Sequence, residues 1–153
     1  MSDLRDLYQQ TILDHTKRPR NFHEVPDANH RANGHNPLCG DKLTVYLKIQ
    51  NDIIQDAGFV GAGCAISTAS ASMMTEMIKG KKVADIAPLF ENFHSMVTAP
   101  IGVEPDEQRL ESLDKLAVFS GVREFPVRVK CATLAWHTLQ AALKDARGPV
   151  STE

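Results

Sequence analysis

The chain has 153 residues, of which 42% are hydrophobic and 24% are charged, and its formal net charge is −2. This composition is ordinary for one globular domain, and the charge gives no electrostatic reason to expect nucleic acid or an anionic membrane as a partner. No apolar run approaches the ~20 residues of a membrane span, and the start, MSDLRDLYQQ, lacks the basic and apolar stretches of a signal peptide. We therefore expect a cytoplasmic protein whose three cysteines stay reduced.

The first half of the chain predicts one helix followed by a small sheet. Residues 3–16 carry apolar side chains on one stripe, as in an amphipathic helix, and Pro19 follows that stretch. Strict alternation of apolar and polar residues, interrupted by the turn Asn51-Asp52, predicts a β-hairpin over 42–61. A short strand near 29–35 would be the third member of this sheet.

The second half of the chain predicts helices. Apolar residues recur at helical spacing in segment 61–82, and residues 83–98 resemble a further helix. The polar, proline-rich stretch near 98–118 is interpreted as a surface insertion with a short helix. Segment 126–146 has a clear apolar face and predicts a strong final helix.

No repeat, low-complexity tract or linker divides the chain. We therefore predict one domain over residues 1–147, followed by a flexible tail over 148–153. A helix, then strands, then helices indicates an α+β fold in which helices pack on a small antiparallel three-stranded sheet.

The three cysteines all fall at the ends of predicted elements. Cys39 and Asp41 are separated by one glycine at the entrance to the first hairpin strand, where residues i and i+2 face the same side. Cys64 ends the second hairpin strand and opens a helix, where backbone N–H groups and the helix dipole favour a thiolate. Cys131 lies near the start of the last helix beside Lys130, whose positive charge also favours a thiolate.

Three thiolates and one carboxylate would supply the four ligands of a tetrahedral Zn²⁺ site. Zinc sites usually carry closely spaced cysteine pairs, however, and these cysteines are far apart in the sequence. Free cysteine is also among the most buried residue types. The residues alone therefore leave three possibilities open: inert buried cysteines, a metal site, or a thiol enzyme.

The longer motifs narrow these possibilities. NPLCGD, GAGCAISTASASMM, SGVREFPVRVKCATLAW and LYQQTILDHTKRPRNF resemble the U-type iron–sulfur assembly family, which includes IscU and the N-terminal domain of NifU. The resemblance covers nearly the whole chain. It implies the IscU/NifU-like fold and a metal site formed by Cys39, Asp41, Cys64 and Cys131.

Two features resemble the SufU branch of this family. The segment between Cys64 and Cys131 is longer than in IscU, and Lys130 stands where IscU-type chains carry a histidine. The branch implies bound Zn²⁺ and, as partners, a SufS-type cysteine desulfurase and the downstream Suf assembly proteins. It also favours Cys39 as the acceptor of persulfide sulfur, with Cys131 as the alternative.

Such a site is anionic, and we expect Arg128 and Lys130 to offset its charge. Two alternatives use the same four ligands: a scaffold that holds Fe²⁺ or a 2Fe–2S cluster, and a structural zinc domain that offers only an interaction surface. Whether the chain is an enzyme stays open, because a zinc-dependent sulfurtransferase of this kind acts as a co-substrate and activator of the desulfurase.

Other residues that can bind metals are expected to be structural. We expect His35, in a turn-rich segment, and His137, on a helix, to make structural contacts rather than to bind a metal. Met73, Met74 and Met77 predict core packing rather than a soft-metal site. A cysteine hydrolase is disfavoured because no histidine is placed as a base for any of the cysteines.

Overall fold

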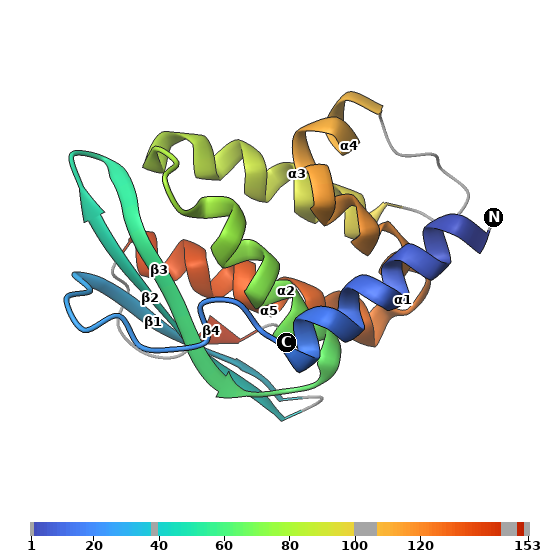
Figure 1. Ribbon diagram of the computed structural model, residues 1–153, viewed down its shortest axis with the longest axis horizontal. Coiled ribbons are helices and arrows are strands. Elements are labelled where there is room, and N and C mark those ends of the chain that lie inside the picture. Colours follow the sequence, from blue (N-terminus) through green and yellow to red (C-terminus); the bar gives the residue numbers. More distant parts are fainter. Residues whose placement is uncertain (1, 38–39, 100–106, 145–149, 152–153) are drawn as a thin grey trace.

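A four-stranded sheet forms one layer of the protein, and the helices gather on one of its faces (Figure 1). The computed structural model describes residues 2–37, 40–99, 107–144 and 150–151. The predicted α+β architecture, three antiparallel strands covered by helices, is confirmed. In chain order the strands are β1 (His30–Asn36), β2 (Asp41–Gln50), β3 (Ile53–Ala62) and β4 (Val150–Ser151).

The predicted hairpin is the pair β2–β3. Its alternating apolar residues point into the core, where Leu43, Val45 and Leu47 are buried. Asn51 and Asp52 form the turn with φ angles of 54° and 62°. A two-residue hairpin turn needs this left-handed conformation, which asparagine and aspartate tolerate better than most residues.

β1 pairs with β2 and confirms the short strand predicted near 29–35. On the other side of β1, β4 pairs in parallel, with Val150 opposite Gly34. Two residues of the segment predicted as a flexible tail, 148–153, form β4, and the others lie outside the described residues. The edge of β1 offers backbone groups with which an extended segment can pair.

The helices pack on the sheet and on one another. α5 (Pro126–Leu143) lies on β1 and β2, and α2 (Ala65–Ile78) lies beside it and against β3. Trp136 of α5 is fully buried, and its ring stacks on Phe93 at a centroid distance of 4.7 Å. The other helices are α1 (Ser2–Lys17), the 3₁₀ helix η1 (Val83–Asp85), α3 (Ile86–Thr98), α4 (Glu107–Leu113) and the 3₁₀ helix η2 (Asp114–Glu124).

The segment predicted as a surface insertion, 98–118, joins the core at its C-terminal end. Residues 100–106 lie outside the described residues, but Leu113 and Leu116 are buried. Phe119, just beyond the segment, meets Phe93 edge-on at a centroid distance of 5.8 Å. These apolar residues recur every three positions, which is the period of a 3₁₀ helix. An amphipathic α-helix mixes spacings of three and four, and a strand has a spacing of two, so neither pattern predicts this element.

A glycine in β1 sets the distance between the sheet and α5. A Cβ atom at Gly34 would lie 2.0 Å from Oγ1 of Thr138 and 3.2 Å from Cδ1 of Leu134. Thr138 is itself held, because its hydroxyl donates to the carbonyl of Leu134 over 2.7 Å. The close contact between β1 and α5 therefore depends on the absence of a side chain at Gly34.

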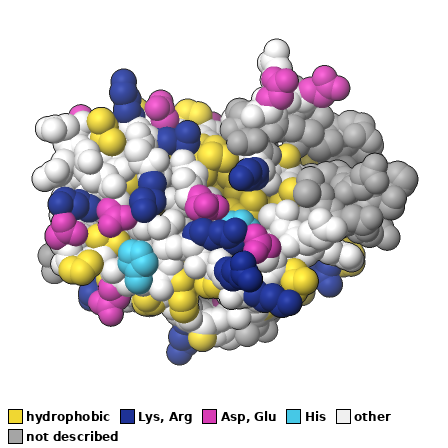
Figure 2. Space-filling view, in the orientation of Figure 1, with side chains coloured by type: hydrophobic (Ala, Val, Ile, Leu, Met, Phe, Trp, Pro, Cys, Tyr) yellow, Lys and Arg dark blue, Asp and Glu magenta, His cyan; other side chains and the backbone are white. Residues whose placement is uncertain are grey.

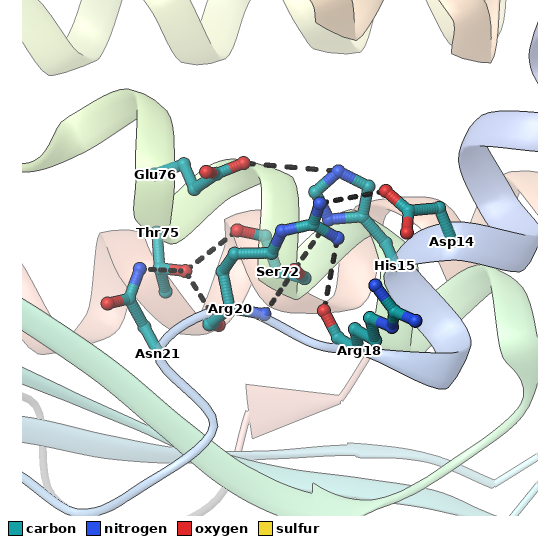
Figure 3. A network of polar contacts seen from close by, with 8 residues as sticks. All are labelled: Asp14, His15, Arg18, Arg20, Asn21, Ser72, Thr75 and Glu76. Atoms are coloured by element: carbon teal, nitrogen blue, oxygen red, sulfur yellow. Dashed lines mark hydrogen bonds and ion pairs between the residues drawn. The ribbon is translucent and has the colours of Figure 1, made fainter.

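A polar network joins α1 to α2 (Figure 3). Nδ1 of the buried His15 lies 2.6 Å from the hydroxyl oxygen of Ser72, which also accepts the backbone N–H of Arg20 over 2.8 Å. The guanidinium of Arg20 donates to Asp14 over 2.7 Å. Burial, and then the charge of Arg20, lowers the pKa of His15, so the folded protein favours the neutral ring.

Charged side chains of both signs share the face shown in Figure 2, with lysines and arginines among aspartates and glutamates. The partly exposed ion pairs of the protein include Lys48 with Asp27 and Lys79 with Asp56. Pairs of this kind contribute little to stability, about 0–1 kcal/mol each. Among the described residues, no helix is long and apolar enough to cross a membrane.

Candidate metal centre

Three of the four predicted ligands meet at the end of the sheet where β3 leads into α2 (Figure 1). One donor atom from each of Asp41, Cys64 and Cys131 lies within 4.8 Å of the other two. Asp41 begins β2, Cys64 immediately precedes α2, and Cys131 lies in α5. Residues distant in the sequence are therefore brought together by the packing of α2 and α5 on the sheet.

The carboxylate of Asp41 is buried and held by the backbone. Its Oδ1 atom accepts the N–H of Cys64 over 2.8 Å, and Oδ2 lies 3.7 Å from the sulfur of Cys64. Gly63 permits this approach, because a Cβ atom there would lie only 3.0 Å from Oδ1 of Asp41. The absence of a side chain at Gly63 therefore leaves room for the carboxylate of Asp41.

Cys64 is the N-cap residue of α2, as its place between strand and helix predicts. Its sulfur accepts the backbone N–H of Ser67 over 3.4 Å, which satisfies one of the unpaired donors of the first helical turn. A hydrogen bond from Cys131, and a weaker one from the N–H of Ser67, lower the pKa of Cys64 to about 7. Burial and the charge of Asp41 raise this pKa but are outweighed. This cysteine is therefore readily ionised and available as a ligand.

Cys131 is buried in α5, and its sulfur meets an amide from β1. Nδ2 of Asn36 donates to Sγ of Cys131 over 3.8 Å, and Asn36 is itself fully buried. In the sequence Asn36 precedes a proline, which is an ordinary turn signal and indicates no role in a site. A polar residue at the last buried position of an alternating strand was the signal that could have found it.

The remaining predicted site residues are Cys39, Arg128 and Lys130. Cys39 lies outside the described residues, and it precedes Asp41 by two positions in the sequence. Arg128 is exposed, and its guanidinium carbon lies 4.3 Å from the ring centroid of Phe125, a cation–π contact. Lys130 is half-buried in the same helix. The charge-offsetting role of Arg128 and Lys130 therefore stays a prediction.

The histidines and methionines named from the sequence are not part of the triad, and His35 lies in β1 opposite Lys42 rather than in a turn. His137 packs edge-on against Phe90 and His94, at centroid distances of 5.4 and 5.8 Å. Met73 and Met74 are buried in the core. Within the described ranges, no second group of three or more histidine, cysteine or acidic side chains is close enough to hold a metal ion.

The donor set fits a metal ion. Buried charges in proteins are normally paired or coordinate metals, and Asp41 is only 1% exposed. Two thiolate sulfurs combined with one carboxylate oxygen suit a borderline-soft ion such as Zn²⁺ better than Mg²⁺ or Ca²⁺. Asp41, Cys64 and Cys131 are therefore the described residues that could hold such an ion.

Comparison with known proteins identifies the family of the chain. The family model of the NifU-like N-terminal domain matches residues 7–93, more than half of the chain. The chain belongs to this family. Its resemblance to the U-type assembly proteins is thereby confirmed, and the matched region includes Asp41 and Cys64 but ends before Cys131.

Two relatives in the family cover almost the whole chain. A protein named zinc-dependent sulfurtransferase SufU, from Bacillus subtilis, is 40% identical over 147 residues, which is 96% of each chain. A protein named iron–sulfur cluster assembly scaffold protein IscU, from Streptococcus pyogenes, is also 40% identical, over 94% of this chain and 87% of its own.

Solved structures of the family share the fold. A SufU from Fervidobacterium islandicum, described as a cluster assembly scaffold protein for the SUF system, superposes with a TM-score of 0.79 at 35% identity, over 91% of this chain and 98% of its own. A NifU-like N-terminal protein from Brucella abortus gives a TM-score of 0.77 at 21% identity, over 92% and 94% of the two chains. The latter likeness concerns the fold alone.

Proposed function

We propose that this protein is a zinc-dependent sulfur carrier of iron–sulfur cluster assembly. It would accept persulfide sulfur from a SufS-type cysteine desulfurase and pass it to downstream Suf assembly proteins. The observation that carries the proposal is the meeting of Asp41, Cys64 and Cys131 within 4.8 Å, in a family member whose relatives include a zinc-dependent sulfurtransferase.

The donor set supports a labile metal site rather than a purely structural one. Structural zinc sites are normally closed by four cysteine or histidine ligands. Here one of the ligands would be Asp41, and Cys39 would be the fourth. Zn²⁺, when bound, would keep the thiolates deprotonated without adding redox chemistry of its own. Arg128 and Lys130 would offset the negative charge of the site.

The proposed transfer exchanges the partners of a thiolate and a persulfide. The thiolate of Cys39 attacks the outer sulfur of the persulfide on the desulfurase cysteine. A new S–S bond forms at Cys39, the S–S bond on the desulfurase breaks, and the desulfurase cysteine leaves as a thiolate. No external oxidant or reductant is needed, because the two proteins together hold one thiolate and one persulfide both before and after the transfer.

Peptide mass spectrometry tests this proposal directly. The zinc-loaded protein is mixed with its cysteine desulfurase and free cysteine, and the added sulfur is located by peptide mapping. One sulfur atom on Cys39, absent after zinc is removed, is the expected result. No added sulfur on any cysteine would refute the carrier function.

A scaffold for a 2Fe–2S cluster is the second candidate, favoured by the relative from Streptococcus pyogenes that is named as a scaffold protein. The same side chains could hold such a cluster as cargo. Lys130 weighs against it, because the scaffold branch carries a histidine at that position. A coloured product on addition of iron and sulfide, together with no persulfide on Cys39, would favour the scaffold.

A further inference from the structure

We propose that Asn36 is a positioning residue that retains Cys131 in the metal centre and thereby directs incoming sulfur to Cys39. This inference rests on the proposed function and concerns which of its thiols takes the sulfur. Both Cys39 and Cys131 are candidates from the sequence. The structure offers a physical reason why Cys131 would be the weaker nucleophile of the two, namely its hydrogen bond from Asn36.

Asn36 lies next to two of the candidate ligands, Asp41 and Cys131. It is the last residue of β1 and stands directly opposite Asp41, the first residue of β2. Residues opposite each other in an antiparallel pair project to the same face of the sheet. Both side chains are buried, and the amide of Asn36 reaches across to α5, where Nδ2 donates to Sγ of Cys131 over 3.8 Å.

The three described donor residues differ in the source of their hydrogen bonds. Asp41 accepts a backbone N–H from Cys64, and Cys64 accepts one from Ser67. Cys131 is the sixth residue of α5, beyond the first four N–H groups that a helix leaves unpaired. The N–H groups around it are used by the helix itself, so a side chain from another element is needed to reach its sulfur.

A hydrogen bond to a thiolate withdraws charge from the sulfur and makes it a weaker nucleophile. A thiolate can only accept, so the NH₂ end of the Asn36 amide must face Cys131 rather than the carbonyl end. Hydrogen bonds to charged groups are the stronger ones, and losing one is expected to change the reactivity of Cys131 by about tenfold or more.

The backbone of Asn36 also connects to the other candidate acceptor. Its carbonyl oxygen accepts the N–H of Gly40 over 2.8 Å, and Gly40 follows Cys39 in the sequence. One residue therefore contacts Cys131 through its side chain and the neighbour of Cys39 through its backbone. A side-chain substitution at Asn36 removes the contact with Cys131 and leaves the backbone carbonyl that accepts from Gly40.

The test replaces the amide without changing its size. Asn36→Leu has a similar volume but no N–H, and Asn33→Leu is the matched control, because Asn33 lies in the same strand with an exposed side chain bonded to Thr44. Zinc-loaded proteins are treated with desulfurase and cysteine, and the persulfide on each cysteine is quantified. We expect the ratio of Cys131 to Cys39 persulfide to rise about tenfold or more in Asn36→Leu and to stay unchanged in the control. An unchanged ratio in folded, zinc-loaded Asn36→Leu would overturn the inference.

A measurement on the unmodified chain decides the case if Asn36→Leu fails to fold or bind metal. With cadmium-113 in the site, NMR should detect coupling between the metal nucleus and the side-chain N–H protons of Asn36, transmitted through the sulfur of Cys131. The N–H of Ser67, which contacts Cys64, is the internal positive control. Coupling at Ser67 without coupling at Asn36 would overturn the inference. This readout needs no desulfurase, so it separates the role of Asn36 from the carrier function.

Discussion

The backbone N–H of Cys64 donates a hydrogen bond of 2.8 Å to Oδ1 of Asp41, so one candidate ligand holds another in place. The carboxylate is thereby oriented before any metal binds. Orientation of ligands in advance reduces the conformational freedom that metal binding has to remove.

Asp41→Ala should weaken zinc binding strongly. The substitution removes a ligand, so the loss of affinity should exceed the about 10–100-fold that follows removal of an outer partner. Competition with a chromophoric chelator measures it. Asp27→Ala is the control, because Asp27 is an exposed aspartate paired with Lys48, away from the triad. Equal zinc affinities for the two variants would show that Asp41 is not a ligand.

Alkylation of zinc-free protein should reveal the low pKa of Cys64. The thiolate is the reactive form, so the rate of reaction with iodoacetamide should rise with pH through a midpoint of about 7. The hydrogen bond from Cys131 is the largest cause of the lowered pKa, so Cys131→Ala should move the midpoint up toward the ordinary value of 9.0. Peptide mass spectrometry measures the rate at Cys64 alone. A midpoint that does not move would contradict the assigned cause.

The free energy of unfolding should fall as the pH is lowered from 7 through 6.5. The pKa of His15 is lowered from 6.5 in the folded protein, chiefly by burial, so the unfolded chain takes up the proton first. The contribution of the neutral ring is complete above pH 6.5 and is lost as the pH falls from there through the lowered folded pKa. Urea unfolding at several pH values measures this slope.

His15→Gln should flatten that slope without abolishing it. The remaining dependence would come from His137, whose pKa is lowered by burial and by His94. Arg20 and Lys115 disfavour protonation of His15, whereas Glu76 and Asp14 favour it. If the unfolding free energy of His15→Gln changed with pH as steeply as that of the unmodified protein, protonation of His15 would not be the cause of the dependence.

Gly34→Ala should destabilise the protein by about 1–3 kcal/mol, the usual cost of overpacking a core. The new methyl group would collide with Oγ1 of Thr138. Combining it with Thr138→Ala should restore part of the loss, because the atom at 2.0 Å is then absent. Urea unfolding of the two single variants and the double variant completes the cycle. Additive losses would indicate that the strand and helix separate instead of clashing.

The sequence could predict the elements whose apolar residues follow a regular period. The hairpin β2–β3 and the helix α5 were predictable from alternation and from helical spacing, and Asn51-Asp52 marked the turn between the strands. The 3₁₀ helix η2 was not, because its buried residues, Leu116, Val118, Phe119, Ser120 and Val122, fit neither the α-helical nor the strand period. The pairing of β4 depends on the exposed edge of β1, which no local pattern reports.

The candidate site was predictable only in part, for a related reason. The sequence places Cys64 and Cys131 at element ends, but their approach depends on how α2 and α5 pack together. Asn36 was not singled out because an asparagine before a proline indicates a turn, although its place at the end of an alternating strand was a usable signal. The contact of Arg128 with Phe125 was likewise invisible, since spacing alone does not show which way a long side chain turns.

The capping role of Cys64 affects how loss-of-function variants should be interpreted. Its sulfur accepts an N–H of the first turn of α2, a helix of 14 residues of which nine are buried. Cys64→Ala would thus remove a ligand and uncap a central helix together, at a cost of about 1 kcal/mol for the cap alone. Cys64→Ser keeps an oxygen that caps helices well and loses the thiol. The serine variant therefore separates the effect of losing the thiol from the effect of destabilising α2, whereas the alanine variant combines the two.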